Sequence, residues 1–238
     1  MKIDKFIEEL KKLKIFVDDD KLSQLNTYYE YLTEYNSHTN LTAVVEKEEV
    51  YLKHFYDSLT LCQVINFDEI NNLIDIGSGA GFPGIVLKIF FPHLKITLLD
   101  SNNKKTTFLS NLVKKLDLDC VTVINARAED YAKDNLNKFD LCVSRAVAFI
   151  DVIAELSLPF ISEKGKVILM KGNFDNEIKI LEKHYKELNI SNYNIHHFLL
   201  LDKDERNLIT LTKNKKTTKV LSYSQIIKRN KLWNIKKL

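Results

Sequence analysis

The chain has 238 residues, of which 45% are hydrophobic and 28% are charged. A chain of this length and composition can bury a sizeable core, so the disordered and fibrous classes of protein are excluded. The formal net charge is only +3, but residues 206–238 contain ten basic residues and no acidic one, which leaves the preceding residues with a net charge of −7. This asymmetry predicts a polyanionic partner.

The cysteines and the N-terminus indicate the cellular compartment. Cys62, Cys120 and Cys142 are odd in number, widely spaced and surrounded by apolar residues. We interpret them as reduced core residues, with neither a metal site nor a nucleophilic thiol. The N-terminus carries charges where a signal peptide needs an apolar segment, and no run approaches the ~18 apolar residues of a membrane span. We therefore expect a cytoplasmic protein with no membrane partner and no metal.

The first part of the chain is predicted to be helical. Apolar residues recur at helical spacing over residues 2–35, and the acidic run at 18–20 divides them into two helices. A polar segment at 36–42 then precedes a third helical stretch over 46–61. Residues 1–64 are therefore predicted to form a helical extension packed on the core.

From residue 72 onward, short apolar runs alternate with helical patterns, which is typical of a parallel sheet with crossover helices. Residues 202–205 are too few for a crossover helix, so the last two strands are predicted to form an antiparallel hairpin at the sheet edge. The core is assigned to residues 65–212 and a basic tail to 213–238. Strands are predicted at 73–76, 95–99, 121–125, 139–144, 166–170, 195–201 and 207–211, and helices at 84–91, 104–116, 149–158 and 175–188.

Four of the six glycines fall within residues 77–84, between a predicted strand and a predicted helix. Backbone amides of such a loop face a ligand at the edge of an open sheet. Its G-x-G-x-x-G pattern suits a nicotinamide dinucleotide, and Asp100, 21 residues after Gly79, suits the ribose of either that cofactor or S-adenosylmethionine. Asp75 opens a D-x-G-x-G-x-G pattern and favours S-adenosylmethionine, because an acid suits its ammonium group better than a pyrophosphate.

Two residues after later strands are candidates for contacts with a cofactor or an acceptor. Glu129 either reaches an adenine amino group or belongs to an acidic helix start. Arg145 ends the fourth predicted strand, where a methyl acceptor usually lies, and no N-P-P-Y loop or Pro-Cys nucleophile is present there. A guanine N7 has a free lone pair and no proton to lose, so we assign no catalytic base. Arg145 is the candidate for positioning the acceptor, or else it forms a structural salt bridge.

The chain resembles the bacterial small-subunit rRNA guanine-N7 methyltransferases, also called the glucose-inhibited division protein B family. The matching segments are residues 40–43, 54–59, 75–84, 99–101, 127–129, 143–147 and 171–172. The resemblance implies a Rossmann-like methyltransferase fold, with a mostly parallel seven-stranded sheet whose last strand is antiparallel. It also implies S-adenosylmethionine-dependent methylation of N7 of a specific guanine in 16S rRNA. By position, Gly77, Phe82, Ala128, Glu129 and Arg145 would contact the cofactor, beside Gly79 and Asp100.

The tail of this family is rich in proline and basic residues, whereas this chain has no proline after Pro159 but keeps the positive charge. Phosphate contacts of such a tail depend on salt and not on base sequence. The expected partner is 16S rRNA or the small ribosomal subunit, and we expect a monomer. The residues predicted to bind RNA are Lys171, Lys215, Lys216, Lys228 and Arg229.

Two other functions are considered. A nicotinamide oxidoreductase would need a group such as Tyr-x-x-x-Lys, which does not follow the fourth predicted strand. A non-catalytic RNA-binding protein would keep the fold and use the cofactor only as a brace. His54 and Asp57, three residues apart on one predicted helix, are interpreted as a brace for the pocket floor, because the chemistry needs no proton transfer.

Overall fold

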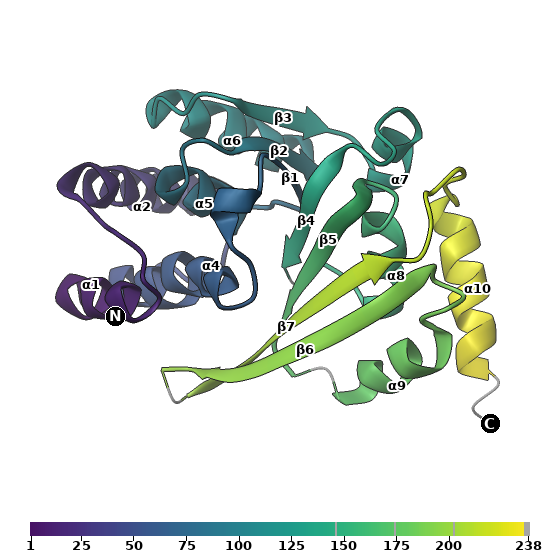
Figure 1. Cartoon of the computed structure of the whole chain (residues 1–238). Coiled ribbons are helices and arrows are strands. Elements are labelled where there is room, and N and C mark those ends of the chain that lie inside the picture. Colours follow the sequence, from purple (N-terminus) through teal and green to yellow (C-terminus); the bar gives the residue numbers. More distant parts are fainter. Residues whose placement is uncertain (146, 174, 202, 236–238) are drawn as a thin grey trace. The chain divides into compact units, whose positions relative to one another are not determined.

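The computed structural model describes residues 1–145, 147–173, 175–201 and 203–235, with the backbone alone at 175, 176 and 232–235. The chain divides into two compact units, Met1–Asn125 and Ala126–Leu238 (Figure 1). The domain limits given above for the extension, the core and the tail stay a prediction. No helix of the described part of the chain is long and apolar enough to cross a membrane.

The first unit begins with helices, as predicted. The Asp18 carboxylate caps the second helix by accepting a hydrogen bond from the Lys21 amide at 2.8 Å, which satisfies one of the free amides of the first turn. This helix runs to Thr39, into the segment predicted to be a polar link. The helical elements are α1 (Ile3–Lys12), α2 (Asp19–Thr39), α3 (Lys47–Val50), the π-helix η1 (Tyr51–Tyr56), α4 (Asp57–Leu59) and the 3-10 helices η2 (Thr60–Gln63) and η3 (Phe67–Glu69).

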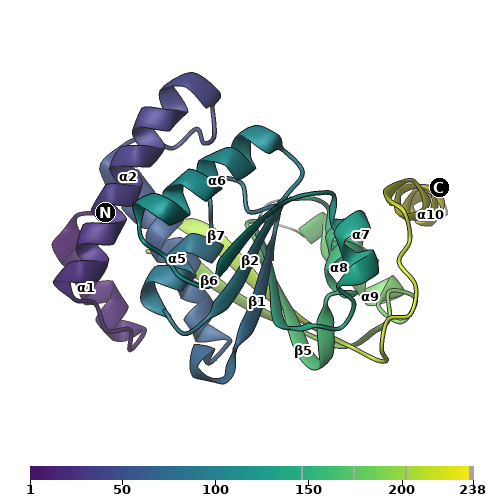
Figure 2. The same ribbon diagram turned by 90° about the horizontal axis from the view of Figure 1, so that it is seen from above.

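Three parallel strands follow, in the order β3-β2-β1. They are β1 (Asn72–Ile76), β2 (Lys95–Asp100) and β3 (Val121–Asn125), each within one residue of its predicted limits. The connecting helices α5 (Gly84–Phe90) and α6 (Asn103–Lys115) lie on one side of β1 and β2 (Figure 2). Because the strands are parallel, the turns that follow β1 and β2 lie at the same edge of the sheet, where the glycine loop begins.

The second unit holds four strands in the order β4-β5-β7-β6. β4 pairs with β5 in parallel, and β7 is antiparallel to both β5 and β6, so the predicted hairpin is confirmed. The strands are β4 (Phe139–Arg145), β5 (Ile161–Lys171), β6 (Ile190–Leu200) and β7 (Asp204–Lys213). The helices are α7 (Ala128–Tyr131), the 3-10 helix η4 (Ala132–Asp134), α8 (Ile150–Ser157), α9 (Asp175–His184) and α10 (Tyr223–Ile235).

Part of the predicted tail is helical. The helix α10 was not predicted, yet Ile226 and Asn230 on it are buried. The basic residues of this segment interrupt its apolar pattern, which hides the helical spacing from a sequence analysis. Lys236 and Lys237 of the predicted tail lie outside the described residues.

The three cysteines are free, and their environments differ. Cys142 is buried as predicted, and burial raises the pKa of the half-buried Cys62 thiol to about 12, so it stays protonated at neutral pH. The interpretation of Cys120 as a core residue is wrong, because its side chain is exposed. Cys120 lies in the turn before β3 with a φ of 55°, a left-handed conformation that belongs to the turn rather than to the strand.

Candidate functional site

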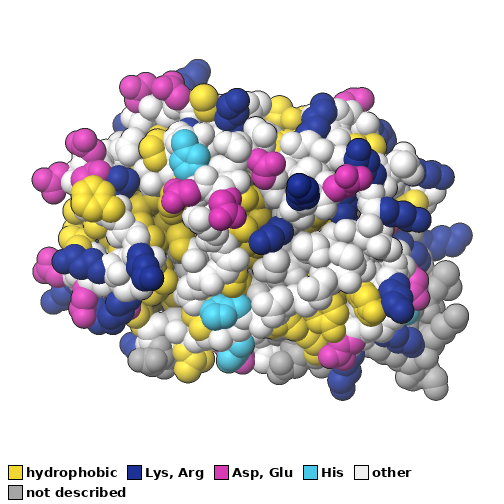
Figure 3. Space-filling view, viewed as in Figure 1, with side chains coloured by type: hydrophobic (Ala, Val, Ile, Leu, Met, Phe, Trp, Pro, Cys, Tyr) yellow, Lys and Arg dark blue, Asp and Glu magenta, His cyan; other side chains and the backbone are white. Residues whose placement is uncertain are grey.

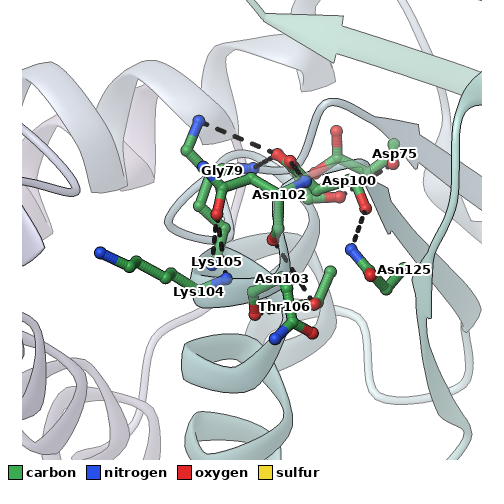
Figure 4. Close-up of polar contacts among 10 residues, drawn as sticks. Asp75, Gly79, Asp100, Asn102, Asn103, Lys104, Lys105, Thr106 and Asn125 are labelled. Atoms are coloured by element: carbon green, nitrogen blue, oxygen red, sulfur yellow. Dashed lines mark hydrogen bonds and ion pairs between the residues drawn. The ribbon is translucent and has the colours of Figure 1, made fainter.

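The glycine loop connects β1 to α5 at the edge of the first unit's strands (Figure 4). Gly77, Gly79 and Gly81 have φ angles of 70°, 59° and 97°, which L side chains rarely adopt. At Gly81 space is also closed, since a Cβ atom there would lie 2.6 Å from the Tyr28 hydroxyl. The loop therefore needs glycine for its backbone path, and the amides of Gly77, Gly79 and Gly81 already donate hydrogen bonds within the protein.

Asp100 closes this loop from the end of β2. Its Oδ2 accepts a hydrogen bond from the Gly79 amide at 3.0 Å, and its Oδ1 accepts one from the Asn102 amide at 2.8 Å (Figure 4). The Lys105 ammonium lies 4.0 Å from Oδ2, and the carboxylate is buried. A carboxylate has about four acceptor sites, so two remain for hydroxyl groups such as those of a ribose. The structure thus brings the predicted residues Gly79 and Asp100 together.

Asp75 has a structural task that the sequence did not reveal. Its side chain is fully buried, and its Oδ2 accepts a hydrogen bond from the Gly84 amide at 2.9 Å, at the start of α5. A Cβ atom on Gly84 would lie 2.8 Å from that same oxygen and would also overlap Leu98. Asp75 was expected to face a ligand's ammonium group, whereas this oxygen fixes the helix start, where the helix dipole favours an acid.

The Phe82 ring is held between two aromatic rings of the N-terminal helices. It stacks on Tyr28 of α2 with centroids 5.2 Å apart and on His54 of η1 with centroids 4.4 Å apart. The Tyr28 hydroxyl also donates a hydrogen bond to the Ala80 carbonyl. Since only 4% of Phe82 is exposed, it can offer a ligand its backbone but not its ring. The N-terminal helices therefore support the glycine loop directly.

The His54 ring is held at both of its nitrogens. Its Nδ1 lies 2.9 Å from the Lys53 carbonyl, which can only accept, so Nδ1 donates this hydrogen bond. Its Nε2 lies 3.0 Å from the Thr42 hydroxyl, with which it shares a second hydrogen bond. With both nitrogens engaged and the ring face on Phe82, the structure gives His54 a bracing role.

Three further residues predicted to contact a cofactor belong to the second unit. Ala128 and Glu129 form the first turn of α7, and Glu129 is buried. Arg145 is the last residue of β4, half-buried, and it pairs in register with Met170 of β5. In the first unit, by contrast, the predicted residues Gly77, Gly79, Phe82 and Asp100 all belong to the loop or contact it.

Lys171 is not a surface residue. Its ammonium donates to the Ala148 carbonyl at 2.6 Å and pairs with the Glu177 carboxylate at 2.6 Å, with 10% of its side chain exposed. The same Glu177 oxygen accepts the Ile150 amide at 2.6 Å. Lys171 and Glu177 thus fix the segment that follows β4. This structural role replaces the predicted contact of Lys171 with RNA, because its ammonium is largely buried and already paired with the Glu177 carboxylate.

Exposed basic residues gather in the segment after β7 and on α10, at the right of Figure 3. Lys215, Lys216 and Lys228 are exposed, and Lys216 forms a loose surface pair with Glu163 at 3.8 Å. Arg229 is largely buried and pairs with Glu155, which makes it a poor phosphate ligand. Three of the five residues predicted to bind RNA are therefore accessible to a polyanion.

The start of the tail is anchored by a buried lysine. The Lys213 ammonium donates hydrogen bonds to the Asn137 side-chain oxygen and to the Ile161 carbonyl, and burial lowers its pKa to about 8. Asn137 in turn binds the backbone of Thr217, accepting from its amide at 3.2 Å and donating to its carbonyl at 3.0 Å. Lys213 is one of the ten basic residues counted in 206–238, and a charge count cannot detect that it is buried.

Sequence comparisons match the chain to proteins of one family. The family model described as rRNA small subunit methyltransferase G matches residues 21–221. Proteins named ribosomal RNA small subunit methyltransferase G from Bacillus velezensis and Bacillus subtilis are 41% and 39% identical, each over 92% of this chain and 93% of the relative. The protein of that name from Mesoplasma florum is 49% identical over 69% of this chain and 70% of its own.

Solved structures show the same fold at low sequence identity. The methyltransferase domain of METTL16 has a TM-score of 0.56 at 15% identity, covering 70% of this chain and 69% of its own. Ribosomal protein L11 methylase from Lactobacillus delbrueckii subsp. bulgaricus has a TM-score of 0.52 at 16% identity, covering 71% and 80%. The predicted fold class, a mostly parallel seven-stranded methyltransferase fold with an antiparallel last strand and an N-terminal helical extension, is confirmed.

Proposed function

The chain belongs to the rRNA small subunit methyltransferase G family, and from this premise we propose that it methylates N7 of a specific guanine in 16S rRNA. It is a methyltransferase whose methyl donor is S-adenosylmethionine. The observation that carries the proposal is the Gly79–Asp100 hydrogen bond, which joins a glycine-rich loop to a strand-end carboxylate. This is the combination that a nucleoside with ribose hydroxyls requires.

The residues present fit this donor. The loop has positive φ angles at three glycines, so its backbone can approach a ligand closely, and Asp100 keeps acceptor sites for ribose hydroxyls. Gly77, Gly79, Phe82 and Asp100 would hold the donor from the first unit, Phe82 through its backbone. Ala128, Glu129 and Arg145 are proposed as further donor contacts from the family resemblance alone, with Glu129 as the acceptor for an adenine amino group.

The chemistry asks the protein for position rather than for proton transfer. When bound, S-adenosylmethionine would supply an activated methyl group on a sulfonium, with a neutral thioether as the leaving group. Guanine N7 attacks with an in-plane lone pair and loses no proton, so no general base is needed. Arg145, at the acceptor end of β4, would orient the guanine through O6 or a phosphate, since a hydrogen bond to N7 itself would occupy the attacking lone pair.

The substrate would be 16S rRNA, free or within the small ribosomal subunit, and the protein would act as a cytoplasmic monomer without a metal. Lys215, Lys216 and Lys228 are exposed and would contact phosphates. Such contacts do not discriminate between base sequences, so specificity would depend on the shape of the RNA and on the acceptor pocket.

The test is transfer of labelled methyl from S-adenosylmethionine to small subunits prepared from cells that lack this protein, followed by nucleoside analysis. We expect 7-methylguanosine in the small-subunit RNA, lost in Gly77→Asp and reduced in Arg145→Ala. Calorimetric binding of the donor is measured in parallel. Donor binding without transfer to subunits or to naked rRNA would refute the proposed acceptor and favour the non-catalytic alternative.

A further inference from the structure

Phe149 exposes an aromatic ring in the segment that follows β4. Its exposed fraction is 66%, and the nearby Val147 is also exposed. Among the large hydrophobic side chains that the structure describes, only Phe16 of the first unit is more exposed, at 76%. Single exposed hydrophobic side chains are common on protein surfaces, so what distinguishes Phe149 is its place just after the end of β4 and the way its backbone is held.

The backbone around Phe149 is fixed on both sides. The Ala148 carbonyl accepts from the Lys171 ammonium, and the Ile150 amide donates to Glu177, each at 2.6 Å. The Phe149 carbonyl itself accepts from the amides of Val152 and Ile153 in the first turn of α8. The backbone of Phe149 is therefore held by hydrogen bonds at the start of this helix, with its ring exposed.

These contacts are unusual, because a largely buried ion pair holds the backbone of a surface segment. The side chains of Lys171 and Glu177 are 10% and 13% exposed, and desolvating such a pair offsets much of its attraction. The ion pair gains its value by fixing the backbone of residues 148–150 in one conformation. A ring on a backbone held in this way has only its own two side-chain torsions left to order on contact, so binding through it costs little conformational entropy.

We propose that Phe149 is the stacking platform for a base of the RNA substrate at the acceptor end of β4. It lies four residues after Arg145, which ends that strand. Protein–RNA recognition commonly holds unstacked bases against aromatic rings, and the stack is tolerant of sequence because every base has a π face. The proposal rests on the proposed function and adds to it the residue that fixes the plane of the base.

The chemistry explains why such a platform is needed. Attack by N7 has no general base to assist it, so the rate depends on the orientation of the guanine plane. Arg145 could fix the edge of a base but not its plane, whereas a ring fixes the plane but not the edge. Phe149 is in this sense a positioning residue of the acceptor and not of the donor.

The experiment compares Phe149→Leu with Phe149→Tyr in the methyl-transfer assay on small subunits. Leucine keeps an apolar side chain and removes the aromatic plane. We expect this variant to lower kcat/KM for subunits by roughly tenfold, through a higher KM or a lower kcat. Tyrosine keeps the plane and is expected to restore kcat/KM to within about twofold of the wild type. Calorimetric Kd for S-adenosylmethionine and the melting temperature should not change in either variant.

Phe16→Leu serves as the matched control, because it makes the same change at the other exposed phenylalanine of the described residues and should leave every value unchanged. The role of Phe149 is refuted if the leucine variant matches the wild type, or if leucine and tyrosine are equally impaired. A wild-type chain that transfers no methyl group would instead refute the proposed function, and the role of Phe149 with it. An active wild type with an unaffected Phe149→Leu variant refutes only the platform.

Discussion

At the scale of single residues, buried polar groups hold the backbone of the glycine loop. Asp75 accepts the Gly84 amide and Asp100 accepts the Gly79 amide, so the loop is tied to the two strands that flank it. Tyr28 adds a third tie from helix α2 through the Ala80 carbonyl. A loop fixed in this way is prepared for a ligand, which lowers the entropy lost on binding.

Removing the Tyr28 hydroxyl tests this preparation. Tyr28→Phe keeps the ring on Phe82 but leaves the buried Ala80 carbonyl without its donor, and we expect the Kd for S-adenosylmethionine to rise several-fold. At saturating donor, kcat should stay near the wild-type value, because Tyr28 does not touch the acceptor chemistry. Calorimetry and steady-state kinetics measure the two effects. Tyr29→Phe, one residue further on α2, is the matched control; a fall in kcat with an unchanged Kd would contradict the prediction.

The lowered pKa of Lys213 should make the stability of the protein depend on pH. Its pKa is lowered by burial to about 8, whereas in the unfolded chain it lies near 10.5. Between these values the unfolded chain binds more protons at this site than the folded chain, so the free energy of unfolding should rise with pH. The rise is at most ~3 kcal/mol, since one pKa unit corresponds to about 1.4 kcal/mol.

Urea unfolding of the wild type and of Lys213→Met from pH 7 to pH 10 measures this effect. The wild type should gain stability relative to the variant as the pH rises through 8. Lys215→Met, which removes an exposed lysine two residues away, should show no such trend. A difference between wild type and Lys213→Met that stays constant with pH would show that Lys213 does not titrate in this range.

At the scale of elements, the start of α5 depends on the absence of a side chain at Gly84. Alanine normally stabilises a helix relative to glycine, by about 1 kcal/mol. Here the added Cβ atom would lie 2.8 Å from an Asp75 oxygen and would overlap Leu98, so we expect Gly84→Ala to lower the free energy of unfolding by ~1–3 kcal/mol. Gly172→Ala, whose nearest neighbour would lie 3.9 Å away, is the control for urea unfolding. Equal stability of the two variants would contradict the overlap.

Elements could be predicted where their apolar rhythm is uninterrupted. β1 to β4 lie within one residue of the predicted limits, whereas β5 starts five residues earlier, because polar residues between 162 and 166 occupy its exposed positions. The loop and Asp100 could be predicted, since their spacing along the chain is short and regular. The roles of Lys171 and Lys213 could not, because their partners Glu177 and Asn137 come from other elements and no spacing announces them.

At the scale of the whole molecule, charge and site chemistry are separable. The residues proposed to hold the donor are a glycine-rich loop and a buried carboxylate, while Lys215, Lys216 and Lys228 are exposed cations. Raising KCl from about 50 to about 200 mM should therefore raise the KM for small subunits steeply and leave the KM for S-adenosylmethionine nearly constant.

Replacing these three lysines by glutamine should lower the slope of log KM for subunits against log salt by about 2 to 3, because each phosphate contact contributes about 0.7 to 0.9. A triple variant with glutamine at the exposed Lys11, Lys14 and Lys95 of the first unit is the control. If both variants lower the slope equally, net charge and not the tail region governs the encounter with RNA.

The strand order also dictates when each unit becomes complete as the polypeptide leaves the ribosome. In the first unit every strand pairs with one that is adjacent in sequence order. In the second unit, β5 cannot complete its pairing until β7 has been synthesised. The Ile161 carbonyl likewise accepts its hydrogen bond from Lys213, which is synthesised 52 residues later. During that interval one edge of β5 is open to foreign strands. In nascent chains stalled before residue 204, the first unit should accordingly resist cleavage by a protease, whereas β5 should be cleaved.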